Sequence, residues 1–286
     1  MTLREFITEG KKRLETSQSH YSDAHQHMEQ LVLRTLGWTP AQILLKLEDS
    51  LSESEINRLS QVLERRLQAE PLQYILGYEW FYKSRFEVGE GCLIPRKETE
   101  QLVDEILKFR PKEKIKIAEL GAGTGNIGIS VILERPHCEW YAFELNPKSF
   151  LFAQRNKQTL LPSAASYSLS LDDFFEGSKS FVPYDIIVSN PPYISDREML
   201  DLPQEVKREP ALALEAGVDG LSIIRRLLDS LPHLLKSQGL FLCEIGSTQE
   251  KIIREEMERR GFKDYQILPD LAGLPRVLKL CKRSSE

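Results

Sequence analysis

The sequence has few cysteines, no excess of positive charge and no long apolar segment. The four cysteines of this 286-residue chain lack Cys-x-x-Cys spacing, which argues against a zinc site or a disulfide framework and for a reducing compartment. The net charge of −5 disfavours a broad electrostatic grip on nucleic acid. There is no run of about 18 apolar residues and no basic-then-apolar leader. We therefore expect a cytoplasmic protein that holds no metal and binds neither membranes nor nucleic acid.

The chain divides by pattern into an all-helical part and an alternating part. Apolar residues recur at helical spacing through residues 2–70, where Thr39-Pro40 begins a short helix and residues 52–55 have the form of a capping box. Residues 1–77 are therefore predicted to form a helical bundle, which either stabilises the structure as a cap or recognises a partner. Residues 78–110 are predicted to form a hairpin and a linker helix.

Strands and helices alternate through residues 111–286. The predicted strands are residues 115–120, 138–144, 166–171, 184–189, 239–245, 264–269 and 276–281. The predicted helices are residues 126–134, 147–159, 219–235 and 248–260. This alternation predicts an α/β fold with a parallel sheet covered on both faces. Because no helix separates the last two strands, one of them should run antiparallel at the edge of the sheet.

The first predicted strand leads into a glycine-rich loop. Gly121, Gly123 and Gly125, with Ala122 and Thr124 between them, allow a sharp turn and a close approach of the backbone to a ligand. Residues 123–128 also match the Gly-x-Gly-x-x-Gly pattern of dinucleotide sites, which is weak evidence when it stands alone.

The next two strands also end in polar residues. Glu144 can accept hydrogen bonds from both hydroxyls of a ribose. Asp173 can accept an amino proton from an adenine edge, while the ring of Phe174 covers the base. With the glycine-rich loop, these strand ends predict a site that holds, in order, an amino-acid or phosphate part, a ribose and an adenine.

The fourth strand ends in Asn190, Pro191, Pro192 and Tyr193. The two prolines have no N–H group and keep the preceding residues extended, so the carbonyls of Asn190 and Pro191 can point outward. Asn190 adds a side-chain oxygen, and Tyr193 adds an aromatic face. Carbonyl oxygens beside a ring suit a planar amino or amide NH2 group that becomes positively charged as it reacts.

These four loops, in this order, resemble those of the Rossmann-like class I S-adenosylmethionine-dependent methyltransferases that modify planar amino groups. More narrowly, the whole chain resembles the HemK/PrmC glutamine methyltransferases of peptide chain release factors. The narrower resemblance rests on residues 71–77, 93–100, 188–194, 209–214 and 217–221. Three positions depart mildly from the family pattern: Glu119 replaces the usual Asp, Ala122 a frequent Thr, and Phe174 a frequent Trp.

The resemblance implies a seven-stranded, mostly parallel sheet with an antiparallel edge strand, in a catalytic domain of residues 111–286. It implies that the bundle recognises a release factor and that the enzyme, expected to be a monomer, methylates the side-chain nitrogen (N5) of the Gly-Gly-Gln glutamine, modulating translation termination. S-adenosylmethionine would be the cofactor and S-adenosylhomocysteine the product. The implied cofactor-binding residues are Gly121, Ala122, Gly123, Thr124, Gly125, Glu144, Asp173, Phe174 and Asn190. The substrate amide would be held by Asn190, Pro191, Pro192 and Tyr193, with Asn190, Pro191 and Tyr193 catalytic.

Three other functions compete with this one. An adenine N6 methyltransferase would use the same fourth loop, but would need a basic groove for nucleic acid. A nicotinamide dehydrogenase would use the glycine pattern, but would leave the fourth loop without a role. A release-factor-binding module with a degenerate methyltransferase fold would not need intact cofactor and substrate loops.

Overall fold

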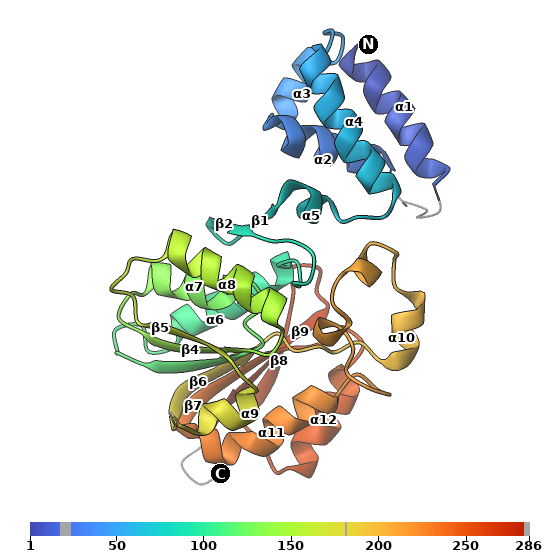
Figure 1. Ribbon diagram of the computed structural model, residues 1–286. Helices are drawn as coiled ribbons and strands as arrows, with labels where there is room; N and C mark the ends of the chain where they lie inside the picture. Colours follow the sequence, from blue (N-terminus) through green and yellow to red (C-terminus); the bar gives the residue numbers. More distant parts are fainter. Residues whose placement is uncertain (18–23, 181, 283–286) are drawn as a thin grey trace. The chain divides into compact units, whose positions relative to one another are not determined.

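The computed structural model describes residues 1–17, 24–180 and 182–282, with the helices and strands labelled in Figure 1. Contacts divide the chain into two compact units. The first contains Met1–Tyr78 and Leu202–Arg208, and the second contains Glu79–Asp201 and Glu209–Glu286. Within the described residues, no helix is both long and apolar enough to cross a membrane.

The first unit is a bundle of helices. These are α1 (Leu3–Glu15), α2 (Ala24–Leu36), α3 (Pro40–Lys46), α4 (Glu53–Leu67) and α5 (Leu72–Leu76). Capping boxes begin α1, α3 and α4, and the box at Ser52 and the helix start at Pro40 were both predicted. The apolar faces of the helices meet in a core that includes Leu3, Met28 and Leu59, none of which is exposed. The predicted helical bundle is confirmed.

A segment from far along the chain, Leu202–Arg208, belongs to the same unit. Arg66, whose side chain is only 4% exposed, pairs with Glu205 at 2.7 Å. Arg208 donates a hydrogen bond to the backbone carbonyl of Gln68 at 2.9 Å. Charged side chains make these contacts, so hydrophobic periodicity gives no sign of them in the sequence.

The second unit is built on a seven-stranded sheet with the order β5-β4-β3-β6-β7-β9-β8. Its strands are β3 (Lys116–Leu120), β4 (Glu139–Glu144), β5 (Tyr167–Leu171), β6 (Tyr184–Ser189), β7 (Leu235–Glu244), β8 (Tyr265–Pro269) and β9 (Pro275–Cys281). A separate hairpin pairs β1 (Tyr78–Phe81) with β2 (Ser84–Glu87). Strands β3 to β7 pair in parallel, and all seven strands of the sheet overlap predicted ones. The predicted α/β fold is confirmed.

Helices cover both faces of this sheet (Figure 1). The helices of the second unit are α6 (Glu100–Lys108), α7 (Asn126–Glu134), α8 (Pro147–Leu160), α9 (Phe174–Gly177), α10 (Asp196–Asp201), α11 (Ser222–Leu234) and α12 (Glu250–Arg259). Short 3-10 turns are Lys97–Thr99, Ser178–Ser180, Val206–Arg208 and Ala211–Ala213. Helices α6, α7 and α8 lie on one face, and α9, α11 and α12 lie on the other.

The antiparallel pairings lie at the β8 end of the sheet, where β9 runs antiparallel to both β7 and β8. Strand β9 is the inner of the last two strands, and β8 is the outermost. Burial explains this order, because Val277, Leu278 and Leu280 of β9 are fully buried, whereas no residue of β8 is. The sequence predicted the antiparallel pairing but left open which of the two strands lies inside.

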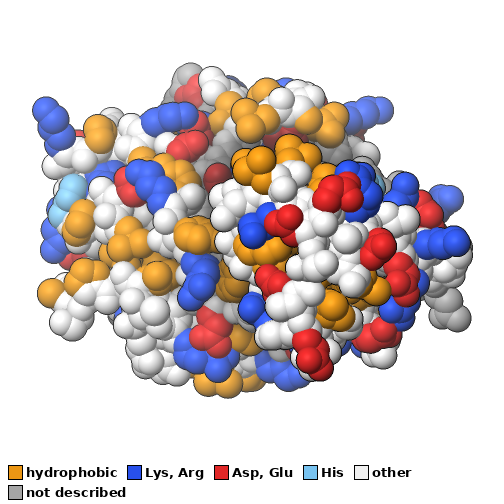
Figure 2. Space-filling view, turned by 90° about the horizontal axis from the view of Figure 1, so that it is seen from above, with side chains coloured by type: hydrophobic (Ala, Val, Ile, Leu, Met, Phe, Trp, Pro, Cys, Tyr) orange, Lys and Arg blue, Asp and Glu red, His pale blue; other side chains and the backbone are white. Residues whose placement is uncertain are grey.

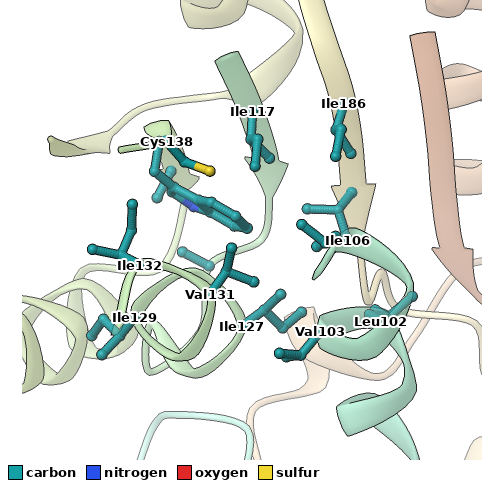
Figure 3. Packing of buried hydrophobic residues seen from close by; sticks show 14 of the residues in the cluster. Leu102, Val103, Ile106, Ile117, Ile127, Ile129, Val131, Ile132, Cys138 and Ile186 are labelled. Carbon is teal, nitrogen blue, oxygen red and sulfur yellow. The ribbon is translucent and has the colours of Figure 1, made fainter. Parts of the chain in front are cut away.

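Tightly packed apolar side chains fill the core between α6, α7 and the sheet, and they hold β3 and β6 in place. In Figure 3, Ile127 and Val131 of α7 and Ile106 of α6 lie against Ile117 of β3 and Ile186 of β6. Each of these side chains is at most 3% exposed. Strands buried on both faces read as continuous apolar runs, as the sequence of β6 does.

Gly128 lets α7 pack directly on the aromatic side chains of β4 and β5. A Cβ at this position would lie 2.4 Å from Nε1 of Trp140 and 2.7 Å from Cε2 of Tyr167. Because both rings are fixed in the core, we expect Gly128→Ala to destabilise the protein by about 1–3 kcal/mol. The last glycine of the Gly-x-Gly-x-x-Gly pattern therefore has a packing role that requires no dinucleotide.

Gly10 of α1 provides the matched control for this prediction. A Cβ there would meet Cε of Met28 at 2.4 Å, but this is the end of a flexible side chain that can turn away. Met28 is buried, so this contact has a cost, but the flexibility of its side chain and the better helix propensity of alanine should keep the loss for Gly10→Ala well below that for Gly128→Ala. Denaturant midpoints of the two variants test the difference, and equal losses of stability would contradict it.

Candidate functional site

A hollow of about 150 Å³ opens beyond the carboxyl ends of β3, β4, β5 and β6. We call it the larger hollow. Its lining is Leu93, Leu120, Gly121, Gly123, Phe143, Glu144, Leu145, Asn146, Ser149, Asp172, Asp173, Phe174, Phe175, Asn190, Pro192, Leu212, Ala213, Ile223 and Arg226. The four predicted strand ends therefore meet at one place, as the carboxyl ends of parallel strands must.

The glycine-rich loop forms one wall of this hollow. Gly121 and Gly123 have φ values of +69° and +58°, and a Cβ on either would meet no other atom within 4 Å. Their backbone is thus exposed to an incoming ligand at a conformation that L side chains rarely adopt. Gly125 instead is the N-cap residue of α7, and Thr124 is fully buried with its hydroxyl 3.1 Å from Oδ1 of Asn126. Neither of these two predicted residues lines the hollow.

Glu144 lies at the end of β4 and holds the glycine-rich loop in place. One carboxylate oxygen accepts a hydrogen bond from the backbone N–H of Gly123, and the other accepts one from the N–H of Asn146, each at 2.7 Å. Burial raises the pKa of Glu144, and these backbone donors oppose that rise. The side chain lines the larger hollow, so its remaining lone pairs face a ligand there.

The end of β5 supplies an aromatic wall. Phe174 is buried and packs edge-on against Phe143 at a centroid distance of 5.6 Å. Asp173 caps α9 by accepting a hydrogen bond from the N–H of Phe175 at 2.8 Å. The guanidinium of Arg226 lies 3.9 Å from the ring centroid of Phe175 and 3.9 Å from Asp173. Sequence reasoning identified Asp173 and Phe174 but missed Arg226, which lies on a helix with no recognisable motif.

Asn190 lies between the larger hollow and a second one. This smaller hollow, of about 20 Å³, is lined by Leu93, Pro95, Arg96, Thr99, Gly121, Ala122, Gly123, Asn126, Ile127 and Asn190. The two hollows share Leu93, Gly121, Gly123 and Asn190. A ligand in the larger hollow and a group entering the smaller one would therefore meet at Asn190.

The other residues of the fourth loop are placed differently. Pro192 lines the larger hollow, whereas Pro191 is buried and Tyr193 lines neither hollow. The ring of Tyr193 packs against the apolar cluster under α11 and α12, and its hydroxyl lies 3.4 Å from Glu244. Burial raises the pKa of Tyr193.

Two buried groups that the sequence did not reveal hold the Asn190 amide. Its Nδ2 donates a hydrogen bond to the Thr99 hydroxyl at 3.0 Å, and that hydroxyl donates to Glu244 at 2.6 Å. Among the residues that the structure describes, Oδ1 of Asn190 has no hydrogen-bond partner. The side chain is therefore fixed through its nitrogen and offers its oxygen as an acceptor.

Glu209 joins two of the strings that carried the family resemblance. Its side chain, 2% exposed, accepts a hydrogen bond from the N–H of Ile94 at 2.9 Å and pairs with Arg96. Residues 93–100 are thereby tied to residues 209–214 at the smaller hollow. The resemblance pointed to both strings, but the residues alone did not show that they touch.

The charges of the larger hollow limit what can bind there. Glu144, Asp172 and Asp173 line it together with one cation, Arg226. This balance suits a ligand that carries positive charge and hydroxyl groups, and it disfavours the two negative charges of a dinucleotide pyrophosphate. An open glycine backbone, an acid at the strand end and a pair of rings fit S-adenosylmethionine, whose sulfonium is cationic.

Comparison with known proteins gives a consistent result. A family model described as the PrmC N-terminal domain matches residues 5–77, and the methyltransferase small domain matches residues 98–242. The chain is 35% identical to a release factor glutamine methyltransferase from Moorella thermoacetica, over 99% of both chains. It is 32% identical to one from Bacillus subtilis, over 87% of this chain and 88% of that protein.

The solved structures add the fold alone. The hMettl16 catalytic domain in complex with the MAT2A 3'UTR hairpin 1 is 12% identical, with a TM-score of 0.59 over 91% of both chains. This likeness shows a methyltransferase fold in the present chain.

Proposed function

Because the chain belongs to the family of release factor glutamine methyltransferases, we propose that it methylates the side-chain nitrogen (N5) of the glutamine in the Gly-Gly-Gln motif of peptide chain release factors. The protein is an S-adenosylmethionine-dependent methyltransferase. The observation that carries the substrate proposal is the Asn190 amide, held through its nitrogen with its oxygen free between the two hollows. Such an acceptor suits an NH2 group, and the product would modulate translation termination.

The larger hollow would hold the cofactor. The loop from Gly121 to Gly125 would hold its methionine part, Glu144 its ribose, and Asp173 with Phe174 its adenine. The cofactor supplies an electrophilic methyl group on a sulfonium, and S-adenosylhomocysteine is left after transfer. Of the loop, Gly121, Ala122 and Gly123 line the hollows and support this assignment.

The protein would then orient a weak nucleophile. An amide nitrogen reacts poorly because its lone pair is delocalised into the carbonyl. Oδ1 of Asn190 and the backbone carbonyl of Pro191 would accept its two N–H bonds and aim the nitrogen. As the N–C bond forms and the S–C bond breaks, positive charge develops on the nitrogen, and these preorganised dipoles stabilise it more in the transition state than in the ground state. The methylated nitrogen, now acidic, would then lose one N–H proton to solvent, which leaves the neutral N-methyl amide. Tyr193, predicted from the sequence to be catalytic, would instead support the loop, since it lines neither hollow and its ring packs against the apolar cluster under α11 and α12.

The helical bundle would recognise the release factor. The match of residues 5–77 to the PrmC N-terminal domain supports this role over that of a stability cap. Leu44 and Leu45 of α3 are 69% and 83% exposed, so the bundle has apolar side chains free for a partner. If the bundle contacts the release factor, the intact factor should be a better substrate than an isolated Gly-Gly-Gln peptide.

We place the enzyme in the cytoplasm as a monomer. All four cysteines are free thiols, which is consistent with a reducing compartment.

A nucleic-acid substrate has less support. On the face shown in Figure 2, Lys and Arg side chains alternate with Asp and Glu, and the described residues visible there form no continuous basic field. The net charge of −5 also disfavours binding to nucleic acid. The protein–RNA complex among the solved structures resembles this chain in fold alone.

Mass spectrometry of a release factor tests the proposal directly. The full chain, incubated with S-adenosylmethionine and intact factor, should add the mass of one methyl group to the Gly-Gly-Gln peptide, on the glutamine. An isolated peptide and an adenine-containing oligonucleotide are the parallel substrates. Methylation of the oligonucleotide alone would overturn the proposal, and equal efficiency on factor and peptide would overturn the role given to the bundle.

A further inference from the structure

A chain of buried hydrogen bonds runs from β7 to the fourth loop. Glu244, at the end of β7, and Thr99, at the end of the turn before α6, are each 1% exposed. The Thr99 hydroxyl lies 2.6 Å from a Glu244 carboxylate oxygen and 3.0 Å from Nδ2 of Asn190. The second Glu244 oxygen lies 3.4 Å from the Tyr193 hydroxyl. All four residues belong to the second unit.

The direction of each bond follows from the number of protons available. An ionised carboxylate can only accept, so Glu244 takes the single proton of the Thr99 hydroxyl. Thr99 then has only lone pairs left for its other neighbour, which must be a donor. Asn190 can meet this demand with its NH2 group but not with its carbonyl oxygen. The reverse orientation of the amide would place two oxygens against each other without a proton.

We propose that Thr99 and Glu244 are positioning residues that fix the Asn190 amide with its oxygen toward the substrate nitrogen. The inference rests on the proposed function, since it assigns these residues to the same NH2-binding site. Glu244 lines neither hollow, and Thr99, which lines the smaller one, is almost fully buried and acts through the Asn190 amide. Their effect is to keep Asn190 in the one of its two amide orientations that accepts a hydrogen bond from the substrate.

Protonation of Glu244 would remove this control. A neutral carboxyl can donate to the Thr99 oxygen, and the Thr99 proton is then free to meet Oδ1 of Asn190. The amide could turn its NH2 group toward the substrate, which repels another NH2. The ionised form of Glu244 is therefore the active one, so the rate should rise with pH as Glu244 loses its proton.

The surroundings of Glu244 set where this occurs. Its titratable and charged neighbours are Cys243 beside it on β7, Glu98 on the turn before α6, Tyr193 on the fourth loop and Arg276 on β9. Arg276 is itself paired with Asp270 at 3.1 Å. Burial raises the pKa of Glu244 to about 7, with Thr99, Arg276 and Tyr193 opposing the rise and Glu98 adding to it. The acid limb of the rate should therefore lie near neutral pH.

Variants of Thr99 in the full-length enzyme test the inference, with intact release factor as substrate. Thr99→Val removes the hydroxyl at almost constant volume and should lower kcat about 10- to 100-fold, with unchanged affinity for S-adenosylmethionine. Thr99→Ser restores the hydroxyl and should recover most of the rate. Ser130→Ala is the control for loss of a polar group, because it removes a buried hydroxyl on α7 that has no hydrogen-bond partner among the described residues.

The pH profile separates positioning from a purely structural role. Wild-type kcat should fall on the acid side near pH 7, and Glu244→Gln should lose this limb because a glutamine does not titrate. The inference would be overturned if Thr99→Val had the same kcat as the wild type, or if Glu244→Gln kept the acid limb of the pH profile. Failure of the wild type to methylate any release factor would instead overturn the proposed function. In that case the same variants are measured on the NH2 substrate that the wild type does methylate.

Discussion

Replacing Asn190 by alanine should reduce methyl transfer by about a thousandfold or more, while S-adenosylmethionine binds nearly as before. Losing one preorganised dipole at a reacting centre commonly costs 10²–10³ in rate. Here the loss is expected to be at the upper end or beyond, because Asn190 both accepts from the substrate nitrogen and aims it. The cofactor should be little affected, since Asn190 is one of many residues that line the larger hollow.

Two measurements make the result interpretable. Calorimetric titration with S-adenosylmethionine checks that the larger hollow is intact, and thermal melting checks the fold. The rate is then measured with saturating release factor, so that weaker factor binding is not mistaken for slower chemistry. Turnover of Asn190→Ala within tenfold of the wild type would remove Asn190 from the catalytic role.

The sequence predicted the fold well where local chemistry decides it. The run at Ile186 and Val188 has no polar face, so it had to be a strand buried on both sides. The cap at Ser52 was visible because its partner, Glu55, lies three residues away. The order of β8 and β9 was not predictable in this way, because which strand lies inside depends on how each fits against β7.

The site was predictable to the extent that each strand end carries its own signal. Asn190 and Glu144 were both identified, and both line the larger hollow. Thr99 and Glu244 were not, because they lie 91 and 145 positions from their partners, Asn190 and Thr99 respectively. A threonine before a helix and a glutamate at the end of a strand are ordinary in sequence. Only the folded chain shows that both are buried and bonded to each other.

Glu119, the departure from the usual aspartate, points away from the site and into the core. It is fully buried on β3, and one carboxylate oxygen accepts a hydrogen bond from the Trp140 indole at 2.8 Å. The other oxygen has no hydrogen-bond partner among the described residues. Burial, opposed by the Trp140 bond, raises the pKa of Glu119 to about 8. The residue lines neither hollow, so we expect its length to act on stability.

The stability of the wild type should therefore fall as pH rises from about 4.5 to about 8. In this window the folded protein keeps a proton on Glu119 that the unfolded chain has released, so the free energy of unfolding falls by roughly 1 kcal/mol per pH unit. The contribution is complete below the unfolded pKa and is lost once pH exceeds the folded one. Glu119→Gln resembles the protonated acid in shape and cannot titrate, so its free energy of unfolding should lack the Glu119 part of this slope. The part that comes from Glu244, whose pKa is also raised by burial, remains in both proteins.

Denaturant unfolding of wild type and Glu119→Gln between pH 5 and pH 8 measures the difference. At pH 8 the free energy of unfolding of the variant, relative to that of the wild type, should be several kcal/mol higher than at low pH. The reason is that the wild type must ionise a buried carboxyl as the pH rises. Glu256→Gln is the control. Burial alone would raise the pKa of Glu256, but hydrogen bonds from Arg259, Arg225 and Arg260 lower it to about 2. Glu256 is ionised in both states across this range, so its variant should differ from the wild type by a constant amount. A constant difference for Glu119→Gln as well would mean that Glu119 is ionised in the core.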